Sequence, residues 1–107
     1  MNKRTAKRKQ DEWERVYGSF DRVNWIRRQK CVITGQDDGW CENVHVKTGG
    51  VGRKADACWI VPMVGWKHME LHRIGVKSFE AKYGIDLQAL AVATEAAWQR
   101  ELKGGDF

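Results

Sequence analysis

The sequence predicts a small α+β domain, and three observations lead to this fold class. The chain has 107 residues, enough for one domain with an adequate core. Two short apolar runs, 44–46 and 58–63, flank a glycine-rich loop, as paired strands do. Segments with apolar residues at helical spacing lie on both sides of these runs. We therefore expect a pair of strands flanked by helices, in a single domain over 11–103.

The first ten residues are rich in Lys and Arg and contain almost nothing apolar. Such a composition predicts a disordered, basic tail over 1–10. A basic arm of this kind can add salt-dependent affinity for a phosphate backbone, or it can serve solubility alone.

Residues 11–30 have the spacing of an amphipathic helix, with acids early and bases late. We expect a break near Gly18, with Ser19 or Asp21 capping the second piece. The aromatic residues of this segment are expected to build core rather than stack on bases. Arg27 and Arg28, near its end, are candidate contacts to a phosphate backbone.

Residues 31–35 predict a short strand or knuckle that ends in a turn over 36–39. The chain has three cysteines, Cys31, Cys41 and Cys58. An odd number with no visible secretory signal favours buried free thiols in a reducing compartment. A structural zinc site built from these three and a histidine is the alternative.

The loop from Thr48 to Lys54 contains three glycines but lacks the spacing of a P-loop. Glycines there allow a tight turn and a close approach to a phosphate. Lys47, Arg53 and Lys54 would supply the positive charge. We therefore expect this loop to contact a phosphate group.

All three histidines lie between residues 45 and 72. His68 and His72 are four residues apart, so on a helix their imidazoles share one face and are close enough to hold one metal ion. Each histidine alone is more often an ordinary surface or core residue. The succession of a strand with His45, a glycine loop, a second strand and a helix with the pair favours a metal-centred catalytic unit.

Glycines and an aspartate predict where the C-terminal helices begin and end. Gly75 is expected to end the helix with the histidine pair, and a second helix over 76–83 to end at Gly84. Asp86 is a suitable N-cap for a third, which would reach about Leu102. Its apolar stripe is expected to pack on the core, with dimer formation as the alternative use.

The net charge of +5 and the pI of about 9.3 favour an anionic partner, and nucleic acid is the usual one for a small basic domain. No apolar run is long enough to span a membrane. We expect a cytoplasmic protein without a membrane partner.

The region that contains the histidines is similar to a known family. The residues that carry the likeness are 42–56, Val61-Pro62-Met63 and 67–72. They resemble the HNH (His-Me finger) endonucleases, in particular the small phage and prophage nucleases related to the Ref recombination nuclease. The resemblance extends from about Tyr17 to about Trp98.

This resemblance implies a ββα-metal core and cleavage of DNA phosphodiester bonds, in phage recombination or DNA processing inside a bacterial cell. His45 would be the general base, and His68 and His72 would hold a divalent ion. Mg²⁺ or Mn²⁺ is the expected working ion, while imidazole ligands also admit Zn²⁺ or Ni²⁺. A homodimer is the alternative to a monomer.

The chain departs from the family pattern at several positions. Val44 stands where many HNH enzymes have a further metal ligand, and Trp59 where they have the middle Asn. Asp56 is the candidate substitute, as a catalytic residue that orients a strand or touches the metal through water; the alternative is that it caps a turn. The zinc-knuckle cysteines are incomplete, with Thr34 and Val64 at two of their positions. A DNA-binding module without turnover and a structural-zinc adaptor therefore remain as rival hypotheses.

Overall fold

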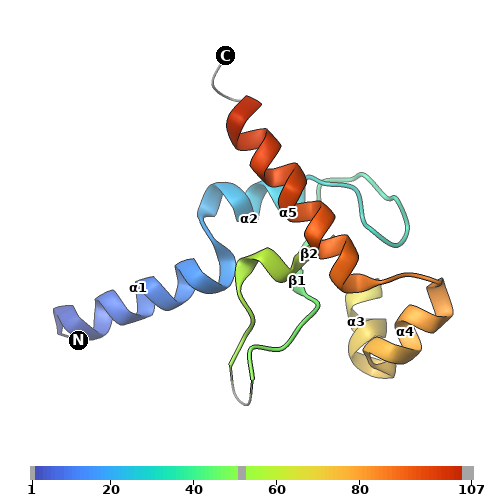
Figure 1. Cartoon of the computed structure of the whole chain (residues 1–107), viewed down its shortest axis with the longest axis horizontal. Coiled ribbons are helices and arrows are strands. Elements are labelled where there is room, and N and C mark those ends of the chain that lie inside the picture. Colours follow the sequence, from blue (N-terminus) through green and yellow to red (C-terminus); the bar gives the residue numbers. More distant parts are fainter. Residues whose placement is uncertain (1, 51–52, 105–107) are drawn as a thin grey trace.

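The computed structural model describes residues 2–50 and 53–104 and has an α+β fold (Figure 1). Helices surround a small antiparallel sheet, and the first helix projects away from the body of the molecule. In chain order the elements are α1 (Lys3–Tyr17), α2 (Phe20–Arg27), β1 (Glu42–His45), the 3₁₀ helix η1 (Ala57–Trp59), β2 (Ile60–Met63), α3 (Gly65–Ile74), α4 (Val76–Tyr83) and α5 (Leu87–Gly104).

The break between α1 and α2 is where the sequence predicts it. Gly18 has φ +87°, a conformation that costs a side-chain-bearing residue energy, so α1 ends there. The Ser19 hydroxyl oxygen then accepts a hydrogen bond from the backbone N–H of Arg22 and caps α2.

The start of α1 differs from the prediction of a disordered tail over 1–10. The helix begins at Lys3, and the side chain of Asn2 accepts a hydrogen bond from the N–H of Thr5. Lys, Arg, Gln and Ala are strong helix formers. Pairs four residues apart, such as Lys7 with Asp11, add support along the solvated face.

The aromatic residues of α1 and α2 divide between core and surface, which corrects the expectation that they all build core. Trp25 and Ile26 pack with Ile60 and Trp98 in one of two buried clusters. Phe20, in contrast, is 73% exposed.

Strands β1 and β2 pair antiparallel, with His45 opposite Ile60 and Val44 opposite Val61. Ile60, Val61 and Met63 are fully buried, so β2 forms the centre of the core. The residues that follow β1 and those that precede η1 lie below the sheet in Figure 1, and an isolated bridge joins Thr48 to Lys54 between them.

The C-terminal helices have the predicted boundaries. Gly75 ends α3, and Gly84 ends α4 in the left-handed conformation. An Asp86 oxygen accepts a hydrogen bond from the N–H of Ala89 and caps α5. Four buried residues of α5 pack this helix against η1 and β2: Leu87, Ala91, Thr94 and Trp98.

Residues 31–35 form a turn rather than a strand, closed by a bond from the N–H of Gly35 to the carbonyl oxygen of Cys31. Cys31 and Cys41 are buried free thiols as expected, whereas Cys58 is exposed. Burial raises the pKa of Cys41 to about 11. Among the described helices, none has the length and apolar character needed to cross a membrane.

Candidate functional site

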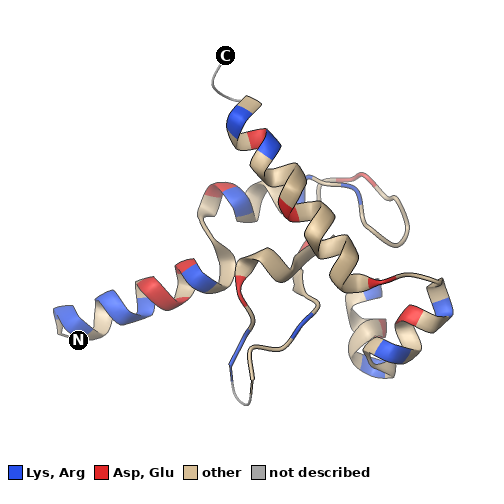
Figure 2. Cartoon of the chain, viewed as in Figure 1, with Lys and Arg blue, Asp and Glu red and all other residues tan. Residues whose placement is uncertain are grey.

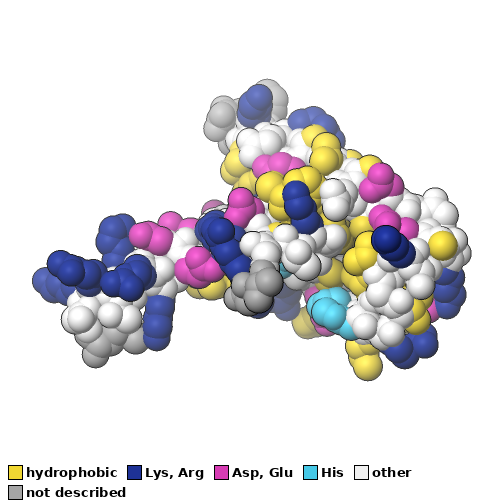
Figure 3. All heavy atoms as spheres, turned by 60° about the horizontal axis from the view of Figure 1, so that its bottom comes forward, with side chains coloured by type: hydrophobic (Ala, Val, Ile, Leu, Met, Phe, Trp, Pro, Cys, Tyr) yellow, Lys and Arg dark blue, Asp and Glu magenta, His cyan; other side chains and the backbone are white. Residues whose placement is uncertain are grey.

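A cavity of about 550 Å³ contains all three histidines, and we call it the histidine cavity. It lies between the end of α1, strand β1, the loop after β1, and α3. Figure 3 shows histidine side chains (cyan) at the surface of the molecule. The lining residues are Tyr17, Asn43, His45, Lys47, Thr48, Gly50, Arg53, Lys54, Ala55, His68 and His72.

His45 is the last residue of β1, and the alternation of the strand directs it away from the core. Val44, its neighbour, is 1% exposed and packs inside. The His45 Nε2 lies 2.8 Å from the backbone oxygen of Val16. Because a carbonyl oxygen only accepts, Nε2 carries the hydrogen in the neutral ring and Nδ1 keeps its lone pair.

The environment of His45 favours the neutral ring. Burial lowers the pKa of His45, and the nearby charges of Lys54, Arg22 and Arg15 lower it further, against the opposing effect of the bond to Val16. At neutral pH the imidazole is therefore uncharged and able to take a proton.

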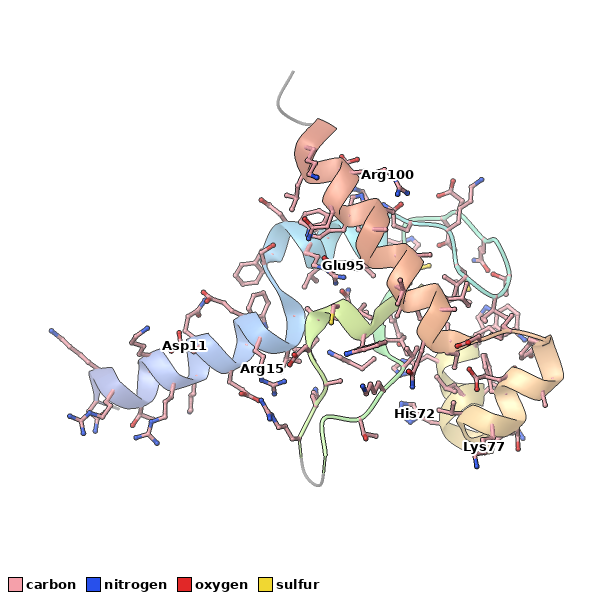
Figure 4. All side chains as sticks on the ribbon, in the orientation of Figure 1. Asp11, Arg15, His72, Lys77, Glu95 and Arg100 are labelled. Atoms are coloured by element: carbon pink, nitrogen blue, oxygen red, sulfur yellow. The ribbon has the colours of Figure 1, made fainter. Side chains whose placement is uncertain are left out.

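His68 and His72 are one turn apart on α3, as predicted, and His72 is labelled beside this helix in Figure 4. Their Nε2 atoms converge to 2.9 Å. Two metal–nitrogen bonds of about 2.1 Å at a right angle place the nitrogens about 3.0 Å apart. The pair therefore has the geometry of two neighbouring ligands of one divalent ion.

Glu42, at the start of β1, orients His68. Its Oε1 lies 2.6 Å from His68 Nδ1, on the opposite side of the ring from Nε2. Gly65 makes room for this contact, because an added Cβ would lie 2.8 Å from Glu42 Oε2. A carboxylate on Nδ1 fixes the orientation of the ring and leaves Nε2 available, as is common for histidines that ligate metals.

A second carboxylate, that of Glu70 on α3, joins this helix to α4. Glu70 accepts hydrogen bonds from Lys82, Tyr83 and Lys67, the last at 3.2 Å. These bonds, led by that of Lys82, lower the pKa of Glu70 to about 2. The network holds the helix that carries both histidines.

The predicted DNA contacts fall into two groups. Lys47, Arg53 and Lys54 line the histidine cavity, as the loop composition suggested. Arg27 and Arg28 are not among its lining residues, and the Arg27 guanidinium lies 5.7 Å from the ring centre of the exposed Trp40. The positive charge at the cavity therefore comes from the loop after β1.

Asp56 has different neighbours from those expected of a catalytic residue. Its Oδ1 accepts a hydrogen bond from Arg15 Nη1 at 2.6 Å, and it lines an adjacent hollow instead of the histidine cavity. Asp56 also makes no capping hydrogen bond to η1. The structure thus assigns it to a contact between α1 and the loop.

Within residues 2–50 and 53–104, no group of three or more His, Cys, Asp or Glu side chains is arranged to hold a metal ion. The alternative of a structural zinc needs four protein ligands, and no group of even three such side chains is found among these described residues. The fit to a metal is therefore that of an open site with two imidazoles.

Sequence reasoning missed Val16, Tyr17 and Glu42 as parts of this site. Tyr17 packs edge-on to His45 with ring centres 5.6 Å apart. The contacts of Val16 and Glu42 join residues 29 and 26 positions apart, which no local pattern shows. The strand register is the signal that would have helped, because it pairs Glu42 with Met63, just before α3.

Comparison with known proteins gives a family but no activity. The family model described as "Protein of unknown function (DUF968)" matches residues 6–100, nearly the whole chain. No curated protein and no solved structure matches the chain.

Proposed function

We propose that this chain, which belongs to the DUF968 family, is a metal-dependent endonuclease that hydrolyses phosphodiester bonds in DNA. The observation that carries the proposal is the arrangement of the three imidazoles in the histidine cavity, with one apart from a converging pair. His45 offers a free Nδ1, while the Nε2 atoms of His68 and His72 converge to 2.9 Å. A base and a pair of metal ligands facing one cavity are what hydrolysis of a phosphodiester requires.

The order of elements supports the finer fold proposal of a ββα-metal core. β1 ends in His45, β2 returns antiparallel to it, and α3 carries the other two histidines. The same order occurs in the HNH family that the sequence resembles. Val44 and Trp59 still lack the side chains of the family pattern, and Glu42 offers a different way to orient the metal ligands.

In the proposed mechanism each residue has a defined task. His45 takes the proton of the attacking water at Nδ1, and its bond to Val16 keeps the ring in the correct tautomer. His68 and His72 would hold the divalent ion, most simply Mg²⁺ or Mn²⁺. When bound, this ion neutralises the charge that develops on the phosphate and the leaving oxygen. Lys47 and Arg53 attract the DNA backbone to the cavity.

A DNA-binding module without turnover is the second candidate. It is favoured by the absence of a third ligand among the described residues.

The setting that we propose, from the resemblance, is DNA processing or recombination by a phage-encoded protein in the bacterial cytoplasm.

The test is nicking of supercoiled plasmid with Mg²⁺, Mn²⁺ or EDTA. His45→Ala should slow nicking at least about 100-fold, the lower range for loss of a general base. His72→Ala should abolish metal-dependent nicking. Met69→Ala, an exposed position between the two histidines of α3, is the matched control and should keep full activity.

Nicking that persists in EDTA, or that survives His45→Ala, would overturn this mechanism. A plasmid that is shifted in a gel but never nicked by the unaltered protein would identify the binding module instead.

A further inference from the structure

A second cavity, of about 610 Å³, runs along α1 and meets the histidine cavity; we call it the α1 groove. It lies on the helix that projects from the body, whose N-terminal half is rich in positive charge (Figure 2). The lining residues are Thr5, Arg8, Lys9, Glu12, Trp13, Val16, Tyr17 and Lys54.

The sequence of α1 places these side chains on one face. Their positions, 5, 8, 9, 12, 13, 16 and 17, follow the three- and four-residue spacing of a helix. From Thr5 to Tyr17 the face is about 18 Å long at 1.5 Å per residue. The groove is therefore an extended track rather than a pocket for a small molecule.

The α1 groove combines half-buried aromatic residues with exposed basic ones. Trp13 and Tyr17 are half-buried, and their ring centres are 5.7 Å apart. Arg8 and Lys9 are exposed. Figure 3 shows Lys and Arg side chains gathered on the projecting helix.

Two side-chain contacts make the surface of the α1 groove more favourable for binding an anionic partner. The carboxylate of Glu12 is paired with Arg15 at 2.6 Å, and Arg15, which also pairs with Asp56, offsets part of the negative charge in the groove. Phe20 packs on Trp13 with ring centres 4.7 Å apart and supports the indole from outside the groove.

The α1 groove continues into the histidine cavity, because Tyr17 and Lys54 line both. The Lys54 ammonium donates a hydrogen bond to the Tyr17 hydroxyl at 2.9 Å. The Tyr17 ring in turn packs against His45. A chain that follows the groove therefore arrives at the proposed base.

We propose that the α1 groove binds a single-stranded segment of the DNA substrate, adjacent to the bond that is cut. This inference rests on the proposed function for the position of the cut. Unpaired bases stack on accessible aromatic rings while cations follow the phosphates, and the α1 groove offers both, because Arg8 and Lys9 are followed along the helix by Trp13 and Tyr17. A duplex keeps its bases stacked inside, so it would use the cations but leave Trp13 and Tyr17 without partners.

The experiment measures binding by fluorescence anisotropy in EDTA, where metal-dependent cleavage is absent. The probes are a labelled oligothymidylate, a hairpin duplex of equal length and an oligouridylate. Trp13→Ala should weaken binding of the oligothymidylate at least about five-fold, the lower end of the contribution of one stacked base, and leave the duplex unchanged. Trp13→Phe, which keeps a ring, should restore most of the affinity.

Trp40→Ala is the matched control, because Trp40 is 70% exposed and lies beside an arginine but outside both cavities. It should bind every probe as the unaltered protein does. The double variant Arg8→Gln/Lys9→Gln should weaken binding of single strand and duplex alike and reduce the salt dependence of both.

Equal loss for single strand and duplex in Trp13→Ala, or no loss at all, would overturn the inference, as would tighter binding of the oligouridylate. Plasmid nicking separates this failure from that of the proposed function. If the protein nicks plasmid but Trp13→Ala binds the oligothymidylate normally, the proposed nuclease activity stands and the proposed role of the α1 groove is wrong. If single-strand binding depends on the Trp13 ring but no nicking occurs, the role of the groove stands and the nuclease activity is wrong.

Discussion

The contact between Glu42 and His68 predicts that a residue which does not bind metal controls metal affinity. In Glu42→Ala the His68 ring loses its partner at Nδ1, so the ring rotates more freely. The two nitrogens that converge in the unaltered protein would then have to be ordered by the metal itself. We expect weaker binding of Mn²⁺ and Ni²⁺ by the free protein.

The size of the effect follows from the geometry. Outer partners of this kind change metal affinity by about 10- to 100-fold. The 2.6 Å contact is short and strong, but the Glu42 side chain is 50% exposed, so water replaces part of the lost interaction. We therefore expect about a tenfold rise in Kd, or about 1.4 kcal/mol. The side-chain oxygen of Glu42→Gln still accepts a hydrogen bond but carries no charge. Its Kd for the metal should therefore lie between those of the unaltered protein and Glu42→Ala.

Isothermal titration calorimetry on the metal-free protein gives this Kd without any dependence on cleavage. Glu101→Ala, an exposed carboxylate on α5, is the control for the loss of one negative charge. Equal Kd values for Glu42→Ala and Glu101→Ala would refute the orienting role and leave the contact as a surface ion pair.

Two further predictions concern pH. Burial lowers the pKa of His45 below its usual 6.5, so the proposed base becomes protonated only below that pH. Single-turnover nicking at saturating metal should therefore reach half of its maximal rate below pH 6.5. A midpoint above pH 6.5 would contradict the assignment of His45 as the base. The hydrogen bonds of the ionised Glu70 carboxylate lower its pKa from 4.5 to about 2 and stabilise the fold above pH 4.5. This stabilisation is lost as the pH falls towards 2 and the carboxylate becomes protonated. Glu70→Gln should therefore lower the Tm at neutral pH and lower it less near pH 2, whereas an equal decrease at both would show that charge is not involved.

Local signals in the sequence predicted most helix boundaries. Ser19 caps α2, Asp86 caps α5, and Gly75 and Gly84 end α3 and α4 because each acts on its own turn of backbone. The same reasoning failed at α1, where charge suggested disorder. Helix propensity and side-chain pairs along the solvated face outweighed it.

The candidate site was predictable only where its residues act through local spacing. The pairing of His68 with His72 follows from one helical turn, and the cations of the loop after β1 follow from their place beside His45. The pairing of Asp56 with Arg15 joins positions 41 residues apart. Such contacts depend on how α1 meets the sheet, and no periodicity in the sequence contains that information.

The end of α1 links the two proposals physically. Val16 lies in the last turn, where carbonyl oxygens have no partner within the helix and are free to accept from outside. One such oxygen fixes the tautomer of His45, and the next residue, Tyr17, forms both the end of the α1 groove and a wall of the histidine cavity. A strand held in the α1 groove would therefore lie next to both groups that position His45: the backbone oxygen that fixes its tautomer and the tyrosine that packs on its ring.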